Sequence, residues 1–214
     1  MNVLGKFIAS VLVVMAVATI GVTVERVWWL SRSAAASRAF VEEVAPFLKS
    51  WDIRAVRKSA EAHSRSVMAK MFAAITRRYV RAHADPSGGG LTPVDLARNE
   101  AERVREAIGS DLRKGMNVLA SVGSVAPFVG LLGTVVGIIG AFADISAKGS
   151  GGLEVVSGKI SEALYETAFG LLVAIPAVLL FNYLSARVAR VELVLARSAG
   201  ELLDDMENHD GSHP

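Results

Sequence analysis

Three long apolar stretches limit what this chain can fold into. The first covers residues 7–24 and the second covers residues 116–143, and neither contains a charged residue. The third covers residues 163–185 and is interrupted by one charge, Glu166. A helix needs about 20 mostly apolar residues to cross the hydrocarbon core of a bilayer. The sequence therefore predicts an all-α membrane protein with three transmembrane helices.

The first stretch has an alternative interpretation as a cleaved signal peptide. Lys6 would then supply the basic region, and Ala34–Ala36 would lie near the cleavage site. The apolar core of a signal peptide is usually about 7–15 residues long, and this stretch is longer. The tryptophan pair Trp28 and Trp29 follows it, and such aromatic residues favour the headgroup boundary. We therefore interpret residues 7–24 as the first transmembrane helix.

The distribution of Lys and Arg predicts the orientation in the membrane. Sixteen of the 23 basic residues lie between Ser31 and Lys114, and three more follow the third stretch. The only basic residues in the segment 144–159 are Lys148 and Lys159. Loops rich in Lys and Arg stay in the cytoplasm. We therefore expect the N-terminus outside the cytoplasm and the C-terminus inside it.

The polar regions are expected to extend the membrane helices into the cytoplasm. Residues 85–91 are typical of a turn, and Thr92-Pro93-Val94-Asp95 is typical of a helix start. Before the second apolar stretch, only Gly109 and Gly115 could interrupt a helix that begins at Pro93 and continues to about Phe142. The predicted organisation is residues 1–30 with the first span, 31–92 as a cytoplasmic helical region, 93–145 as a long helix containing the second span, 146–159 as a periplasmic loop, 160–207 as the third span with a cytoplasmic C-terminal helix, and 208–214 as a disordered tail.

The second stretch is unusual in its glycines. Gly123, Gly130 and Gly137 recur every seven residues, and Gly133 forms a small-xxx-small pair with Gly137. Small residues let membrane helices approach closely, because lipid supplies no hydrophobic force that drives helices together. We expect this helix to be packed tightly against other helices rather than surrounded by lipid.

Two prolines lie inside the apolar stretches. Pro127 and Pro176 cannot donate a backbone hydrogen bond, so the carbonyls of Gly123 and Leu172 are freed. A kink that neighbouring helices or water satisfy is the commoner consequence, and a functional hinge is the alternative. We expect both prolines to shape their helices.

Four polar residues within or next to the second and third stretches are the candidate functional residues. Glu162 and Glu166 are four residues apart and therefore share a helix face. Glu162 lies close to the outer interface and could simply be solvated there. Glu166 is deeper, where a carboxylate is energetically costly and by default indicates a path for protons or ions. Thr134 and Thr167 are the candidate hydroxyls beside these acids, although threonine in a membrane helix often bonds only its own backbone.

The two threonines are expected at the same depth. Thr134 precedes Asp144 by about 15 Å of helix, and Thr167 follows Lys159 by about 12 Å. If Asp144 and Lys159 both mark the outer surface, the hydroxyls differ in depth by less than one helical turn. Together with Glu162 and Glu166 they predict a polar pore lining in the outer half of the bilayer.

The composition argues against several other classes of protein. The chain has no cysteine, and its four histidines are scattered through charged or terminal sequence. We find no nucleophile beside a base, no phosphate-binding loop and no metal-ligand pattern. The sequence therefore predicts no enzyme, no catalytic residue, no metal or other cofactor, and no nucleic-acid partner.

Two blocks of sequence carry a family resemblance. Residues 124–139 (SVAPFVGLLGTVVGII) resemble the second span of the ExbB/TolQ branch of the MotA/TolQ/ExbB proton-channel family. Residues 160–177 (ISEALYETAFGLLVAIPA), followed by Asn182 and Tyr183, resemble its third span. Three spans with a basic helical insert fit this branch better than the stator branch, which typically has four spans.

The resemblance implies a homopentamer in the bacterial inner membrane, with a pore lined by the second and third spans. Such pentamers surround two copies of a single-span ExbD/TolR-like partner whose intramembrane Asp carries the proton. By motif match, Thr134 and Thr167 would line the pore, Glu162 would be the family's third-span glutamate, and Pro127 would shape the second span. Glu166 departs from the pattern, because the family places a non-acidic residue there.

We therefore predict the channel subunit of a motor that uses proton-motive force. The coupling ion would be the proton, and a TonB-like, TolA-like or motility protein would be a further partner. The driven process could be TonB-type import, Tol-type envelope maintenance or gliding motility. Two alternatives remain: a non-conducting membrane scaffold and a small-solute transporter subunit, although no internal repeat of the kind found in transporters is visible.

Overall fold

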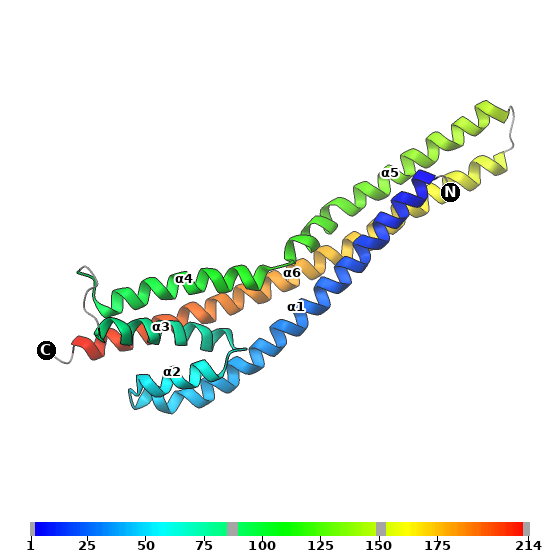
Figure 1. Ribbon diagram of the computed structural model, residues 1–214. Coiled ribbons are helices and arrows are strands. Elements are labelled where there is room, and N and C mark those ends of the chain that lie inside the picture. The colour runs from blue at the N-terminus through cyan, green and yellow to red at the C-terminus, as the bar shows by residue number, and fades with distance from the viewer. Residues whose placement is uncertain (1–2, 85–89, 149–152, 212–214) are drawn as a thin grey trace. The chain divides into compact units, whose positions relative to one another are not determined.

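The computed structural model describes residues 3–84, 90–148 and 153–211 (Figure 1). Every element assigned in these ranges is a helix, and three of the helices are long and apolar enough to cross a membrane. These findings confirm the predicted all-α class and the three candidate spans. The helices in the described ranges are α1 (Val3–Lys49), α2 (Ile53–Ala62), α3 (Val67–Ala84), α4 (Pro93–Arg113), α5 (Met116–Lys148) and α6 (Leu153–Gly211).

The long helix expected from Pro93 is interrupted at Gly115. Helix α4 ends at Arg113, and α5 begins at Met116. Gly115 has a φ of +78°, a left-handed conformation in which any other residue would strain its Cβ. The prediction of one unbroken helix was therefore wrong at this position, because a glycine allows the chain to leave the helical conformation there.

The predicted start of this helix is confirmed. Thr92 Oγ1 accepts a hydrogen bond from the Asp95 N–H at 3.1 Å, and the Asp95 carboxylate accepts one from the Thr92 N–H at 3.1 Å. This reciprocal arrangement is a capping box. The hydrogen bond from the Thr92 hydroxyl, followed by that from its N–H, lowers the pKa of Asp95 below its usual range.

The helices extend further than predicted around the expected loop and tail. Helix α5 continues to Lys148 and α6 begins at Leu153, so helix occupies most of the region predicted as a loop at 146–159. Helix α6 also continues to Gly211, although a disordered tail was predicted from residue 208. The expected turn at residues 85–91 lies mostly outside the described residues.

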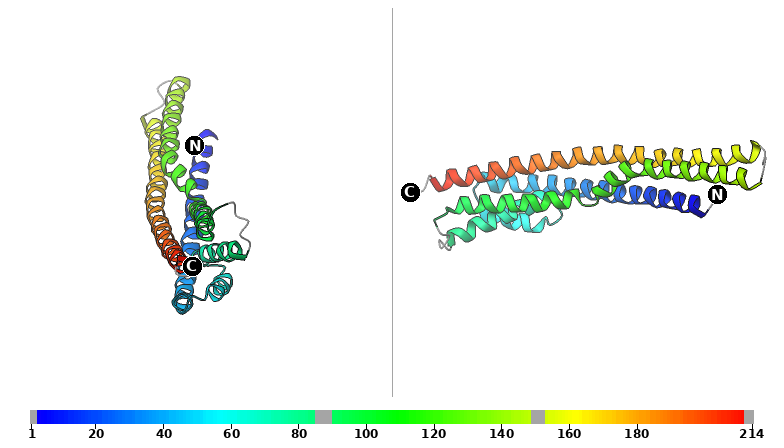
Figure 2. Two further views of the ribbon diagram at one scale, coloured as in Figure 1. Left: turned by 90° about the vertical axis from the view of Figure 1, so that its left-hand side faces the viewer. Right: turned by 90° about the horizontal axis from the view of Figure 1, so that it is seen from above.

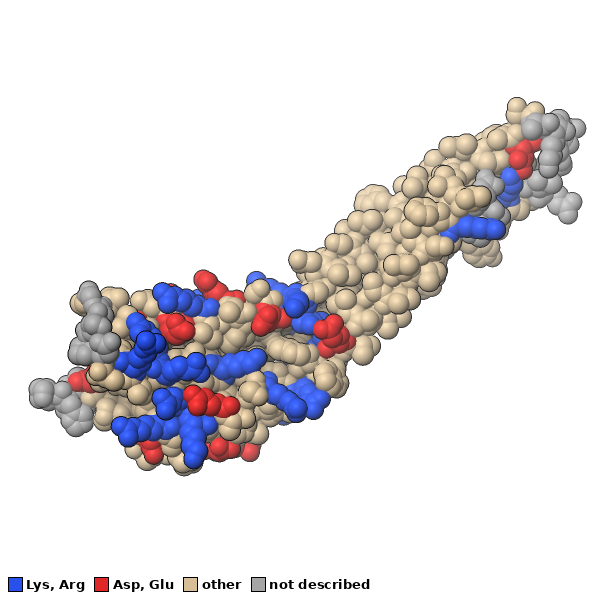
Figure 3. Space-filling model, in the orientation of Figure 1, with Lys and Arg blue, Asp and Glu red and all other residues tan. Residues whose placement is uncertain are grey.

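The chain divides into two compact units. The first comprises Met1–Arg26 and Gly115–Ser185, and the second comprises Val27–Lys114 and Ala186–Pro214. On the face shown in Figure 3, the surface of the second unit carries many Lys, Arg, Asp and Glu side chains, whereas that of the first is almost entirely uncharged. The division therefore follows the segregation of charge along the sequence.

In the first unit, the N-terminal part of α1, α5 and the N-terminal part of α6 run alongside one another (Figures 1 and 2). Large apolar side chains such as Phe128 and Leu172 nevertheless face outward, with 70% and 66% of their surface exposed. Such a surface fits lipid or further membrane helices. The buried residues that hold the three helices together are Ile8, Leu12, Val122, Ala126, Val173, Ala174 and Ala177.

In the second unit, α3 packs against α2 and α4. Its core includes Phe40, which is fully buried and meets Phe72 edge to face at 5.5 Å. At the surface, Arg113 of α4 pairs with Glu192 of α6 at 2.8 Å. Exposed ion pairs each contribute only about 0–1 kcal/mol, so the apolar core holds this unit together.

A polar cluster fixes the end of α6 within the second unit. The Tyr79 hydroxyl donates to Asp210 Oδ1 at 2.5 Å, and the rings of Trp51 and His209 are 4.6 Å apart. His83 Nε2 lies 3.3 Å from the same carboxylate. These contacts explain why the helix continues through residues for which a disordered tail was predicted.

Replacing Tyr79 by Phe should destabilise the second unit by about 1.5–3 kcal/mol, because the hydrogen bond to a carboxylate is lost. Burial, followed by the bond to Asp210, raises the pKa of Tyr79 above its ordinary value of 10.0. The folded chain therefore keeps a proton that the unfolded chain releases. The contribution of the protonated Tyr79 hydroxyl to the stability of the folded chain is therefore complete below about pH 10 and is lost as the pH rises further.

Thermal unfolding of the detergent-solubilised chain at pH 7 and above pH 10 measures both effects. The same change at Tyr165, which is 73% exposed, is the control and should leave the midpoint unchanged. Equal midpoints for Tyr79→Phe and the wild type at pH 7 would contradict the stabilising role of this bond.

Candidate functional site

Helices α5 and α6 approach each other through glycines. A Cβ on Gly170 would lie 2.7 Å from the carbonyl oxygen of Ala126 and 3.0 Å from the Cα of Gly130. A Cβ on Gly130 would lie 2.9 Å from the carbonyl oxygen of Glu166. The two backbones therefore touch at this level, and only glycine fits on either side. Gly130 was predicted as a packing residue, whereas Gly170 was missed.

The heptad-spaced glycines of α5 all face α6. A Cβ on Gly123 would lie 2.6 Å from Val178 Cγ2, and one on Gly137 would lie 2.5 Å from the Cβ of Ala163. With Gly130 between them, these residues form one continuous contact stripe. The seven-residue repeat in the sequence thus marks the side of α5 that packs on α6.

Thr134 and Thr167 face each other across this helix contact. Their hydroxyls are in contact, Thr134 donates to the carbonyl oxygen of Ala163 at 3.1 Å, and Thr167 donates to that of Gly130 at 3.0 Å. Both threonines thus bond the neighbouring helix instead of their own. Two hydroxyl protons serve three contacts, so each hydroxyl can donate either to a carbonyl or to the other hydroxyl.

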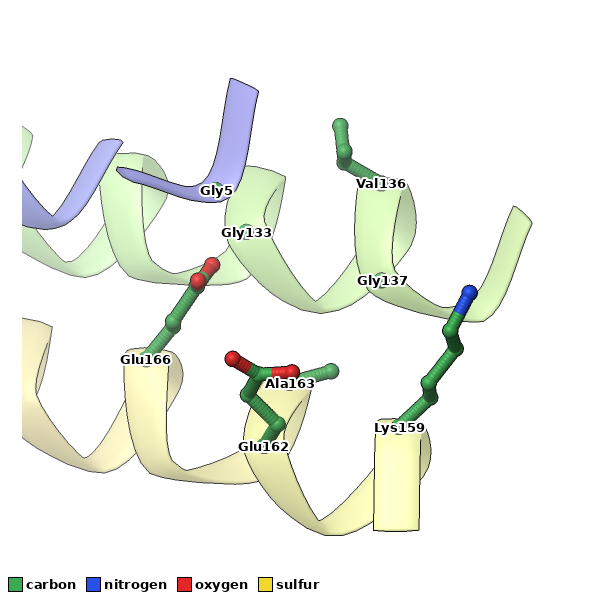
Figure 4. Close-up of a pocket in the computed structure, with 8 residues that line it drawn as sticks. All are labelled: Gly5, Gly133, Val136, Gly137, Lys159, Glu162, Ala163 and Glu166. Atoms are coloured by element: carbon green, nitrogen blue, oxygen red, sulfur yellow. The ribbon is translucent and has the colours of Figure 1, made fainter. Parts of the chain in front are cut away.

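The Glu166 carboxylate lies in a notch between two further glycines. A Cβ on Gly5 of α1 would lie 3.0 Å from Glu166 Oε1, and a Cβ on Gly133 of α5 would overlap Oε2 (Figure 4). Within the described residues, Oε2 is enclosed and has no hydrogen-bond partner. Gly133 therefore makes room for the Glu166 side chain, and Gly5 is a site residue that sequence reasoning missed.

A small cavity of about 40 Å³ adjoins this notch. Glu162 and Glu166 both border it, together with Lys159 and Gly137 (Figure 4). A cavity needs about 10–15 Å³ of such volume to hold one water molecule, so this cavity can hold water beside the two acids. The two glutamates thus share one face of α6, as their spacing predicted.

An ion pair lies at one end of this region. The Lys159 ammonium contacts the Asp144 carboxylate and so joins α6 to α5. Asp144 and Lys159 therefore lie at the same level, as the predicted common depth of Thr134 and Thr167 requires. The contact between Thr134 and Thr167 follows from the same register of the two helices.

The two prolines lie within continuous helix. Pro127 is half-buried inside α5, and Pro176 is exposed inside α6. Because the helix assignment continues through both, neither proline ends its helix. Among the residues that the structure describes, no group of three His, Asp or Glu side chains is placed to hold a metal ion.

Comparisons with known proteins bear on this arrangement. The model of the MotA/TolQ/ExbB proton channel family matches residues 63–196, which include Thr134, Glu162, Glu166 and Thr167. Among curated proteins, "Biopolymer transport protein ExbB" of Xanthomonas campestris pv. campestris (strain B100) is 42% identical over 138 residues, which are 62% of this chain and 53% of that protein.

Two further proteins of the same name are similar over shorter regions. That of Salmonella typhimurium is 39% identical over 102 residues, covering 48% of this chain and 42% of its own length. That of Neisseria gonorrhoeae is 46% identical over 86 residues, covering 39% of each. The chain thus spans about half the length, or less, of these curated relatives. The family match covers more than half of the chain, which is therefore a multi-pass membrane protein of the ExbB/TolQ branch of the MotA/TolQ/ExbB proton channel family.

Proposed function

We propose that this chain is the channel-forming subunit of a motor in the bacterial inner membrane. Five copies would surround two copies of an ExbD/TolR-like protein, with α5 and α6 of each copy lining the central pore. The N-terminus would lie in the periplasm and the C-terminus in the cytoplasm. Proton-motive force would drive a movement of the partner that performs work in the periplasm or at the outer membrane.

The cluster of Thr134 and Thr167 with two nearby acids is the observation that carries this proposal. Ionisable groups inside a membrane helix cost free energy, and their presence is by default interpreted as an ion or proton path. Both hydroxyls can exchange hydrogen-bond partners, which suits a surface along which a proton or a partner's carboxyl group passes. Pro127 and Pro176 would adjust the shape of the two lining helices.

Glu162 and Glu166 have different proposed roles. Glu162 matches the family's third-span glutamate and would face the proton path. Glu166 would border the same path from the water-sized cavity that the two acids share. Its carboxyl group occupies the notch at Gly5 and Gly133, so it would also tie α1 to the lining helices.

The names of the relatives suggest which process the motor would drive. Proteins named for biopolymer transport are similar over the channel-forming helices, so import through a TonB-like protein is the first candidate. Tol-type envelope maintenance and gliding motility could use the same unit. A non-conducting scaffold is the second candidate function, because both threonine hydroxyls already have partners within one chain.

Liposomes containing the chain and its single-span partner test the proposal. A membrane potential that is negative inside the liposomes should drive proton uptake only when both proteins are present. A pH-sensitive dye trapped inside the liposomes reports this uptake. Replacing the partner's membrane aspartate by asparagine is the matched control and should reduce uptake to the level of the chain alone.

A second version of this experiment tests whether sodium is the coupling ion. Uptake that is unchanged when sodium replaces potassium outside the liposomes identifies the proton as the coupling ion. The absence of any partner-dependent flux, in liposomes where both proteins co-purify as one complex, would favour the scaffold.

A further inference from the structure

An open cavity of about 340 Å³ lies in the second unit, far along the sequence from the polar cluster of the membrane helices. It is formed where the middle of α1 faces the turn before α3 and the first turn of α3. Its size is at the lower end of the range of small-molecule sites. The lining residues are Trp28, Trp29, Arg32, Ser33, Ser64, Arg65 and Lys70.

The cavity is strongly positive. Three cations, Arg32, Arg65 and Lys70, border it, and its lining includes no acidic residue. Arg32 lies 4.8 Å from the centre of the Trp28 ring, which holds its guanidinium at the rim through a cation–π contact. Within the described residues, no ion pair neutralises any of the three cations. The site therefore favours an anion.

The start of α3 adds to this preference. Ser66 caps the helix, because its Oγ accepts a hydrogen bond from the Ala69 N–H at 3.0 Å. The N-terminus of a helix carries about half a positive charge, and α3 is 18 residues long. Arg65 and Lys70 flank this end of the helix, so the charge of the helix and of the side chains has the same sign.

Ser33 is an independent indication of a ligand. It is 6% exposed, it borders the cavity, and its Oγ has no hydrogen-bond partner among the described residues. One turn further along α1, Ser37 bonds Ser66 at 2.9 Å, so a serine on the same side of the helix is satisfied within the chain. A buried hydroxyl without a partner is unfavourable, and an acceptor oxygen in the cavity would remove that penalty.

The place of the cavity along α1 identifies the kind of anion. The first apolar stretch ends at Val24, and α1 continues through it without interruption. At 1.5 Å per residue, Trp28 and Trp29 lie about 6–8 Å beyond the hydrocarbon, which is the depth of the headgroup layer. Trp28 is 60% exposed, as an aromatic residue at the membrane interface often is. Lipid phosphates are the anions that occupy this layer.

The geometry points to a binding site for the phosphate-bearing headgroup of an anionic phospholipid. Arg65 and Lys70 contact the phosphate oxygens, Ser33 donates its hydroxyl hydrogen to one of them, and Trp28 lies beside the glycerol region. A lipid held in this way links the membrane surface to α1 and to the start of α3. This site is separate from the proposed proton path and does not depend on it.

Binding of short-chain lipids to the full chain in detergent tests this site. Dihexanoyl phosphatidylglycerol should change the tryptophan fluorescence with a Kd at least about tenfold lower than that of dihexanoyl phosphatidylcholine. The double variant Arg65→Gln/Lys70→Gln should raise the Kd for phosphatidylglycerol about tenfold or more. The control Arg38→Gln/Lys58→Gln removes the same charge from exposed positions outside the cavity and should leave this Kd unchanged.

Several outcomes would overturn the assignment. Equal Kd values for the two lipids, or an equal loss in the control variant, would exclude a local headgroup site. Inorganic phosphate that binds as tightly as phosphatidylglycerol would reassign the cavity to a free phosphate compound. A glutamate-rich peptide that displaces the lipid with higher affinity would reassign it to an acidic protein segment. If the double variant does not fold, Ser33→Ala replaces it and should weaken phosphatidylglycerol binding but not phosphatidylcholine binding.

Discussion

Replacing Thr167 by valine is expected to reduce proton-driven activity at least about tenfold, equivalent to about 1.4 kcal/mol in the barrier. Valine has nearly the shape of threonine but carries no hydroxyl. The change removes the bond to the Gly130 carbonyl and the contact with Thr134. The polar surface that we propose for the proton path is then broken at its centre.

The same change should leave the fold almost intact. Hydrogen bonds between membrane helices contribute on average only about 0.6 kcal/mol, because the unfolded chain in the membrane also finds partners. The glycine contacts between α5 and α6 do not involve the hydroxyl. A loss of activity with normal assembly therefore separates a functional hydroxyl from a structural one.

Proton uptake in liposomes with the partner, together with the yield of the complex after purification, measures this prediction. Thr167→Ser is the matched control, because it keeps the hydroxyl and should retain most of the activity. Wild-type activity in Thr167→Val would remove the hydroxyl pair from the proton path. Parallel loss of activity and of assembled complex would assign Thr167 to packing alone.

The second large effect is expected at Gly170. A valine there would place its Cβ 2.7 Å from the Ala126 carbonyl oxygen and 3.0 Å from the Gly130 Cα. Both atoms belong to the backbone and cannot rotate away, so α5 and α6 must separate. Overpacking a tight contact typically costs about 1–3 kcal/mol, and here it would also separate the two threonines. We expect Gly170→Val to lower the amount of folded chain in the membrane severely and to abolish activity.

Gly158 provides the control on the same helix. A Cβ there would meet no atom within 4 Å, so Gly158→Val should be folded and active. The fraction of chain that remains monodisperse after detergent extraction and heating measures the difference. Normal stability of Gly170→Val would mean that the close approach of α5 and α6 is not required.

Much of the membrane-embedded part could be predicted from local sequence. Absence of charge marks the spans, and the seven-residue repeat of glycines marks the face of α5 that meets α6. Helix rise, counted from the charged residues Asp144 and Lys159, placed Thr134 and Thr167 at a common level, and the structure brings their hydroxyls into contact. These features depend on periodicity within one helix, which the sequence contains directly.

The break at Gly115 could not be predicted in the same way. Gly109 and Gly115 look alike as isolated glycines in a polar helix. Gly109 stays helical, and a Cβ there would lie 2.9 Å from Glu192 Oε1, so it serves a close contact with α6. Gly115 instead takes a positive φ. Tertiary contacts decide between these uses of glycine, and they involve residues far away in the sequence.

The surroundings of Glu166 were also beyond local reasoning. Its spacing from Glu162 gives a shared face of α6 but not the helix that this face meets. Gly5 lies near the start of α1, about 160 residues away, and nothing in the sequence pairs it with an acid.

The notch around Glu166 has a consequence for biosynthesis. The ribosome makes α1 and α5 before α6, so Gly5 and Gly133 are already available when the acid emerges. A charged side chain at the centre of a lone helix costs about 2.5–3.5 kcal/mol during translocon insertion, and Glu166, which lies nearer the outer end of its span, costs less than this. Two earlier helices that together accommodate the carboxyl group would lower this penalty for the last one. The order of synthesis thus favours delivery of the most polar helix into a site that its predecessors have prepared.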